Sequence, residues 1–506
     1  MSAAAHLSWF ARHEFRLAWR EWLAMMTGGR RRRNRAVIGL LIFAAVLHLP
    51  AYAVVGRFAD LQLPLDPGSL IVLTTTIFLA WALMLSQAIE SVTRVFYARA
   101  DLDLIMSSPV KLTNIFSVRI AAIALSVTSM ALLLSTPFID VLAIYGGPRW
   151  LAGFGVVIAI GLSAAAVAIA ITVLLFRLIG PSKTRLVAQI VSAIIGAGFV
   201  IALQVAAILS YGTLSRFAVL TSDTATRIAP NPDSLVWWPA RAALGDLEAM
   251  LLLLAFGLIL LGSVMAAFAP RFADTIVSVA ANPTSVTRGR GKSFRSGSRP
   301  QALRRKEFLL LRRDPWLMSQ SLMQLLYLVP PALMLWRSFS DSAIAIVLIT
   351  PVIVMAAGQL SGGLAWLTIS GEDAAELVAT APLDPSRVIR AKIEVVLIVI
   401  GVLFAPLVIA LGFASLLQAT VTAIAILIAT ASAAAIQLWF RVQAKRTQFR
   451  RRQTSSRVAT FAEAFCSIGW AATATLALTI PIGAIVTGIM TLLVLAGTWK
   501  ISPKRA

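Results

Sequence analysis

Long apolar segments that recur along the chain constrain its fold more than any other feature. Segments of roughly 20 residues, the length that a helix needs to cross a hydrocarbon core of about 30 Å, can be placed about twelve times in the 506 residues. Hydrophobic residues make up 59% of the chain and charged residues 13%, outside the range of soluble globular domains. We therefore expect an all-α polytopic membrane protein with spans centred on 36–56, 69–91, 116–138, 151–176, 187–210, 250–269, 318–336, 343–367, 394–414, 417–440, 459–479 and 481–498.

The net charge of +23 is distributed as membrane topology requires. With a cytoplasmic N-terminus, twelve spans place most of the 45 Lys and Arg residues on the inner side, and both termini are then cytoplasmic. The basic clusters are explained by topology and by contact with anionic membrane lipid. Nucleic acid is not expected as a partner, because no aromatic-rich basic domain accompanies the charge. The outer side keeps only Arg57, Arg149, Arg216, Arg227, Arg241 and Arg337.

Few residues could support catalysis or hold a cofactor. Cys466 is the only cysteine and the three histidines are scattered, so no metal site is expected. The triplet Gly291-Lys292-Ser293 ends like a phosphate-binding loop, but Val286 stands where the first glycine belongs and the context is a Gly/Ser/Arg-rich linker. We therefore predict that the chain is not an enzyme, carries no cofactor and does not hydrolyse ATP itself.

Two amphipathic segments resemble each other, one before the first span and one before the seventh. The predicted interface helices are 9–26 and 303–317, and their composition suits the inner membrane surface. Aligning Glu14 with Glu307 also aligns Arg12 with Arg305, Phe15 with Phe308 and Arg20 with Arg313.

Two inner loops also resemble each other, 97–119 after the second span and 371–392 after the eighth. Each is predicted to form a short helix, then a hinge, then the next span. Acids favour the helix start, and Asp384-Pro385 is typical of an N-cap followed by proline at the first helical position. Aligning Pro109 with Pro382 also aligns Asp103 with Glu376, Leu104 with Leu377 and Arg119 with Lys392.

The paired segments predict two repeated six-helix halves. The first half is 1–270, the second is 301–506, and a basic cytoplasmic linker, 271–300, joins them. A short amphipathic helix on an inner loop cannot reach a substrate in the membrane, but it can dock in a groove of a cytoplasmic partner.

In both loops an acid and leucines precede a Ser/Thr-x-Pro sequence, and a basic residue follows. This pattern resembles the permease subunits of ABC-2-type transporters, and the chain resembles two such permeases fused into one. The resemblance implies a bacterial inner-membrane exporter driven by two separate cytoplasmic ATPase subunits that bind ATP-Mg. It implies ATPase-coupling residues in the loops, Asp101, Asp103, Leu104, Ile105, Ser108, Pro109, Arg119, Glu372, Glu376, Leu377, Pro382, Pro385 and Lys392. The interface helices contribute Arg12, Glu14, Phe15, Arg20, Arg305, Glu307, Phe308 and Arg313.

The halves depart from each other outside the membrane. The family carries outer hairpins between the fifth and sixth spans, and 211–249 is a candidate in which Trp237 and Trp238 would anchor at the interface. The second half has only the short link LTIPIG, 478–483, so we expect an asymmetric outer side. Its loop also has Ala374 at the position of Asp101.

Two other classes stay open. A secondary carrier of the major facilitator type also has twelve spans in two halves, but such carriers place ionisable groups near the membrane midplane. We interpret Glu90, Glu394 and Glu463 as interface-facing carboxylates beside arginines near the inner helix ends. A membrane-embedded enzyme would need convergent catalytic groups, which the sequence does not provide. A non-transport membrane scaffold is the third alternative.

Overall fold

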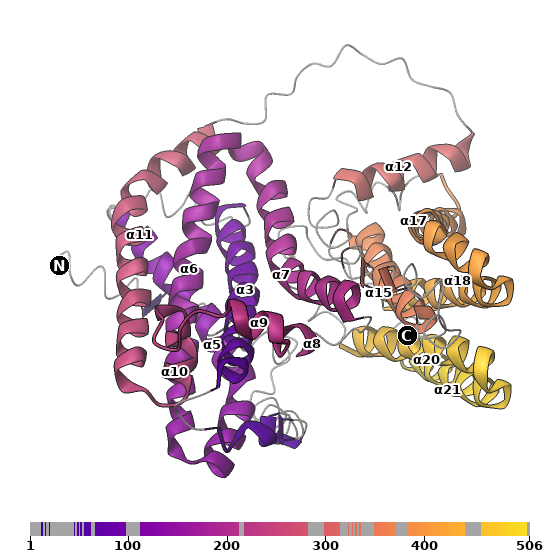
Figure 1. Cartoon of the computed structure of the whole chain (residues 1–506). Coiled ribbons are helices and arrows are strands. Elements are labelled where there is room, and N and C mark those ends of the chain that lie inside the picture. The colour runs from indigo at the N-terminus through magenta and orange to yellow at the C-terminus, as the bar shows by residue number, and fades with distance from the viewer. Residues whose placement is uncertain are drawn as a thin grey trace. The chain divides into compact units, whose positions relative to one another are not determined.

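A computed structural model describes residues 55–61, 66–97, 112–211, 217–281, 298–313, 349–370, 382–440 and 457–502, with a few isolated positions elsewhere. These parts are helical, with turns and bends between the helices and no strand among them. The chain divides into two compact units, 1–287 and 288–506, and the boundary falls inside the predicted linker 271–300 (Figure 1).

The first unit is built from five long helices. They are α3 (Pro67–Tyr97), α5 (Leu112–Gly146), α6 (Ala152–Ile179), α7 (Pro181–Tyr211) and α11 (Leu247–Ala281). Gly180, at φ 73°, ends α6, and Pro181 begins α7 at once. A left-handed glycine followed by a proline ends one helix and starts the next within two residues.

The second unit begins with the shorter helix α12 (Arg299–Arg313). Its five long helices are α15 (Ile349–Ser370), α17 (Pro385–Ala414), α18 (Leu416–Trp439), α20 (Arg457–Thr479) and α21 (Pro481–Ile501). Among the described residues of both units, ten helices are long and apolar enough to cross a membrane. They correspond to ten predicted spans, and the spans predicted at 36–56 and 318–336 lie largely outside the described residues.

The long helices pack in the same order in the two units. In the first, α3 contacts α6 and α7 while α5 packs on α6. In the second, α15 contacts α18 and α20 while α17 packs on α18. The last helix breaks this correspondence, because α11 packs mainly on α6 whereas α21 packs mainly on α20.

The connection before the last helix explains the difference. In the first unit, α8 (Phe217–Leu220), α9 (Asp223–Ile228), η3 (Leu235–Trp237) and α10 (Trp238–Ala243) lie between α7 and α11. This length allows α11 to reach the far side of the bundle. In the second unit only Ile480 separates α20 from α21, and the two helices pack closely on each other. The predicted asymmetry between the halves is present at this point.

The connecting segment of the first unit has its own small core. Trp150 and Trp237 pack there with Leu70, Ala240 and Leu244. The Trp237 indole donates to the backbone oxygens of Pro230 and Asn231 at 3.2 and 3.0 Å. Trp237 is only 4% exposed, so the expectation that it anchors in the membrane interface is wrong. We call this segment, residues 217–246 with Trp150, the outer cap, after the side of the membrane on which the sequence predicts it.

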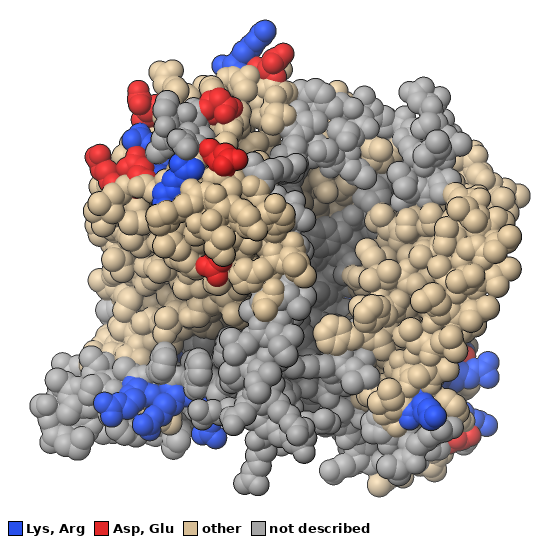
Figure 2. Space-filling model, turned by 90° about the horizontal axis from the view of Figure 1, so that it is seen from below, with Lys and Arg blue, Asp and Glu red and all other residues tan. Residues whose placement is uncertain are grey.

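Charged side chains lie toward the ends of the first unit. In Figure 2 they gather at opposite ends of that unit, and a broad, largely uncharged band lies between them. Such a band is what a hydrocarbon core requires of the surface that it covers.

Candidate functional site

Helix α12 buries a carboxylate on the face where most amphipathic helices bury a leucine. Glu307 is 0% exposed, one turn before the buried Leu311 and one turn after the half-buried Leu303. Residues spaced by four share a helix face, so the three point into the unit together. Phe308 is 49% exposed and Arg305 is also exposed, on the other side of the helix.

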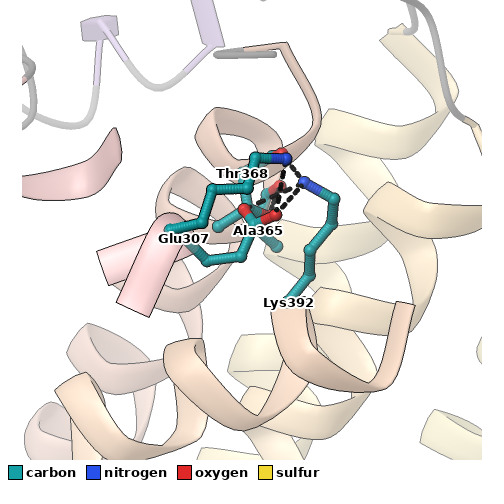
Figure 3. A network of polar contacts seen from close by, with 5 residues as sticks. Glu307, Ala365, Thr368 and Lys392 are labelled. Atoms are coloured by element: carbon teal, nitrogen blue, oxygen red, sulfur yellow. Dashed lines mark hydrogen bonds and ion pairs between the residues drawn. The ribbon is translucent and has the colours of Figure 1, made fainter. Parts of the chain in front are cut away.

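Lys392, in the third turn of α17, neutralises this buried carboxylate. Its ammonium group donates to both carboxylate oxygens of Glu307 at 2.9 Å (Figure 3). Lys306 Nζ also lies 3.5 Å from Glu307 Oε1. A carboxylate without water needs such charge-assisted hydrogen bonds, because an unpaired buried charge is very costly.

The same ammonium group also reaches a third helix. Lys392 donates to the backbone oxygen of Thr368, near the end of α15, and the Thr368 hydroxyl donates to Ala365 O at 2.8 Å. One cation therefore joins α12, α15 and α17. We call Glu307, Thr368 and Lys392 the three-helix clamp. It ties the predicted interface helix to the two helices on either side of the predicted coupling loop.

A weaker ion pair supports the clamp at the surface. Glu394 accepts from Arg390 of its own helix at 2.8 Å and lies 3.5 Å from Arg304 of α12. These groups are partly or largely exposed, so each pair contributes about 1 kcal/mol or less. The prediction that Glu394 lies beside arginines is confirmed.

The start of α17 is capped as the sequence predicts. Asp384 accepts a hydrogen bond from Ser386 N at 2.9 Å, and Pro385 is the first helical residue. This hydrogen bond holds the pKa of the Asp384 carboxyl below its usual value. The cap fixes the direction in which α17 leaves the loop.

The structure places some predicted site residues and not others. Pro382 is exposed in a bend before α17, and Arg313 ends α12. Arg12 and Arg20 are helical and exposed. The remaining predicted loop and interface-helix residues lie outside the described residues, namely Glu14, Phe15, Asp101, Asp103, Leu104, Ile105, Ser108, Pro109, Glu372, Glu376 and Leu377.

The first unit carries a buried cation at the matching place. Arg119, which the sequence aligns with Lys392, lies in the third turn of α5 and is 3% exposed. Both basic residues thus lie inside their units and not on a surface that a soluble partner could cover. Lys392 holds three helices together, a role that the sequence alone did not distinguish from a role in docking.

One residue was misplaced by sequence reasoning. Glu463 of α20, predicted to face the interface, is only 7% exposed, so that prediction is wrong. The feature that could have indicated its burial is its place on α20, six residues after the helix begins at Arg457. Within the described parts, no group of three or more His, Cys, Asp or Glu residues could hold a metal ion.

Comparisons with protein-family models, with curated proteins and with solved structures find no match to the chain. Any functional conclusion therefore depends on the site itself.

Proposed function

We propose that the chain is the membrane-spanning permease subunit of an ATP-binding cassette transporter of the ABC-2 type. Separate cytoplasmic ATPase subunits, two per chain, would bind ATP-Mg and drive it. Substrate would move by alternating access, in the direction of export across a bacterial inner membrane.

The three-helix clamp is the observation that carries this proposal. A permease driven from outside needs a loop that a partner can push and a rigid connection from that loop to the spans. The loop between α15 and α17 leaves from Ser370 and returns at Asp384. Lys392 lies two turns beyond the return and binds both Glu307 and Thr368. A displacement of the loop would therefore move α12, α15 and α17 together.

The burial of the clamp supports a mechanical role. A carboxylate and an ammonium group, 0% and 12% exposed, stabilise a fold no better than well-packed apolar residues do. Unlike an apolar pair, the ion pair has hydrogen bonds of fixed direction, which hold the helices in one register. A connection that has to survive repeated movement of helices as packed bodies gains from such a fixed register.

The experiment targets the loops themselves. Leu104→Asp and Leu377→Asp, introduced together, should release the ATPase from the complex purified in mild detergent and abolish transport. A carboxylate at an apolar docking position is costly, whereas the same change on an exposed loop is tolerated, so membrane insertion should stay normal. Leu309→Asp on α12, at a partly exposed position, is the matched control and should retain the ATPase. Normal ATPase retention and transport in the double variant would overturn the proposal.

A secondary carrier is the second candidate, and one observation favours it. Glu463 is an ionisable group buried among predicted spans, as in many ion-coupled carriers. Transport by the purified chain alone in liposomes, driven by a proton or sodium gradient, would decide for this candidate. Transport only with ATP and a copurified ATPase would decide against it.

A further inference from the structure

Helix α12 presents a mixed face on the side away from the clamp. Arg305 and Arg312 are exposed, and Phe308 between them is 49% exposed. Positions three, four and seven residues apart share one side of a helix. The outward face of α12 therefore carries an aromatic ring with a guanidinium group about one turn away on either side. This combination is typical of helices that lie in a membrane interface.

Positive charge exceeds negative charge on this side of α12. Arg305 and Arg312 form no ion pair within the part of the chain that the structure describes. Arg304 of α12 and Arg390 of α17 share one carboxylate, that of Glu394, at 3.5 and 2.8 Å. Four arginines therefore lie beside a single exposed carboxylate, and such a surface attracts an anionic partner.

The exposed charge of the second unit is concentrated in this region. Except for Lys500 near the end of α21, every exposed charged side chain described in this unit belongs to α12, to the cap Asp384 or to the first three turns of α17. In Figure 2 the charged side chains of the second unit lie at one end of it, next to a broad uncharged surface. The basic face of α12 thus lies close to the surface that a hydrocarbon core would cover.

The contacts of α12 with α17 fix its depth along a candidate span. The apolar span Ser386–Ala414 has 29 residues. Its length of about 43 Å at 1.5 Å per residue matches a bilayer with both headgroup layers, about 40–45 Å. Lys392 lies about 9 Å along the helix from Ser386, near the boundary between headgroups and acyl chains. Because Glu307 of α12 binds Lys392, α12 lies at this level.

We propose that the outward face of α12 binds anionic phospholipid of the inner leaflet. Arg305 and Arg312 donate hydrogen bonds to lipid phosphate oxygens, and the Phe308 ring lies against the acyl chains. Arginine suits this role because its planar guanidinium group can form two parallel hydrogen bonds with a phosphate. The depth of α12 favours lipid over a soluble protein as the partner, since headgroups and acyl chains meet at that level.

The bound lipid attaches α12 from the side opposite the clamp. Glu307 holds the inward face of the helix through Lys392, and lipid holds the outward face. The position of α12 then depends on the headgroup composition of the leaflet. This inference goes beyond the proposed transporter function, because it requires neither an ATPase nor a transported substrate.

The first test uses the unaltered full chain, purified and reconstituted without any ATPase into phosphatidylcholine vesicles. The vesicles contain a trace of a lipid with a photoreactive acyl chain, either phosphatidylglycerol or phosphatidylcholine. Mass spectrometry locates the labelled residues after illumination. We expect the phosphatidylglycerol probe to label α12 around Phe308 more strongly than the phosphatidylcholine probe, and added salt to reduce the difference.

Two results would overturn the proposal. Equal labelling of α12 by the two probes would mean that the contact is apolar only and that the arginines do not select the headgroup. An absence of label on α12, with label present on α17 and α21, would mean that a protein surface covers this face instead of lipid.

Variants test the assigned arginines. Each arginine near an anionic membrane surface strengthens binding roughly fivefold, so Arg305→Gln/Arg312→Gln should remove most of the preference for phosphatidylglycerol. The matched control is Lys183→Gln/Arg227→Gln, which removes two exposed cations from the first unit and should keep the preference. An unchanged preference in the α12 variant, or an equal loss in both variants, would contradict a site at Arg305 and Arg312. Labelling is measured without transport, so its failure would leave the proposed transporter function untouched.

Discussion

The ammonium group of Lys392 lies 2.9 Å from both carboxylate oxygens of Glu307, a residue with no exposed surface. The two residues are 85 positions apart and belong to α17 and α12. Their contact therefore depends on the tertiary arrangement of the second unit. It fixes α12 to the bundle. If α12 moved away, Lys392 would lose the carboxylate that balances its charge.

Breaking the clamp from one side should cost more than removing it altogether. Glu307→Leu or Lys392→Met alone leaves a buried charge without its partner, so each should lower the free energy of unfolding by about 3–5 kcal/mol. The double variant Glu307→Leu/Lys392→Met replaces the pair by apolar groups and should be closer to the unaltered protein than either single variant. Thermal unfolding in mild detergent measures the three effects.

The control for this comparison is Glu394→Gln. The Glu394 side chain is 32% exposed and its partner Arg390 is 82% exposed, so the loss should be about 1 kcal/mol or less. Additive effects of the two clamp variants would contradict a direct interaction between Glu307 and Lys392.

Acid should loosen the start of α17 through its cap. The Asp384 pKa is lowered in the folded protein by the hydrogen bond from Ser386 N, so the cap stabilises α17 fully above the ordinary aspartate pKa of about 3.9. This stabilisation is lost as the pH falls through the lower, folded pKa. Asp384→Asn keeps an acceptor at the cap and should remove the pH dependence. Hydrogen exchange of the peptide that contains Ser386 and Arg387 reports the opening, and equal pH dependence in both proteins would contradict this role.

The sequence predicted local features of the fold well because their causes are local. Apolar length alone indicates a span, and Asp384-Pro385 carries its own capping chemistry. The short link at Ile480 also keeps the start of α21 next to the end of α20, and the two helices pack on each other.

Tertiary pairings were harder to predict. Glu307 and Lys392 were each singled out, but as parts of separate motifs, because nothing in either motif indicates that the two side chains meet. The available signal was that both halves have an acid at one aligned position, Glu14 and Glu307, and a base at the other, Arg119 and Lys392. Glu463 was misplaced because its burial depends on Gly362 of another helix, 101 positions earlier in the numbering.

The outer cap should open when its central indole is removed. Trp237→Ala deletes a buried side chain and two hydrogen bonds to Pro230 and Asn231. Large-to-small changes of this kind cost about 3–5 kcal/mol, and the loss should remain local because the cap core is separate from the main core. Limited proteolysis should become faster within 217–246. Leu235→Ala, at a residue 66% exposed, is the control and should leave the rate unchanged.

The outer cap and helix α12 are predicted to lie on opposite sides of the membrane, and single cysteines test this directly. In a Cys466→Ala background, Thr224→Cys on α9 and Gln301→Cys on α12 both introduce thiols at exposed positions of described helices. Because basic residues are concentrated on the predicted inner side, an impermeant maleimide applied to intact cells should label Thr224→Cys but not Gln301→Cys. Both should react after the membrane is permeabilised, which shows that each thiol is accessible. The native Cys466 is buried and should remain unlabelled in the parent chain under either condition. Labelling of Gln301→Cys in intact cells would place α12 outside, where no cytoplasmic ATPase could act on the clamp, and would contradict both the orientation and the proposed transporter function.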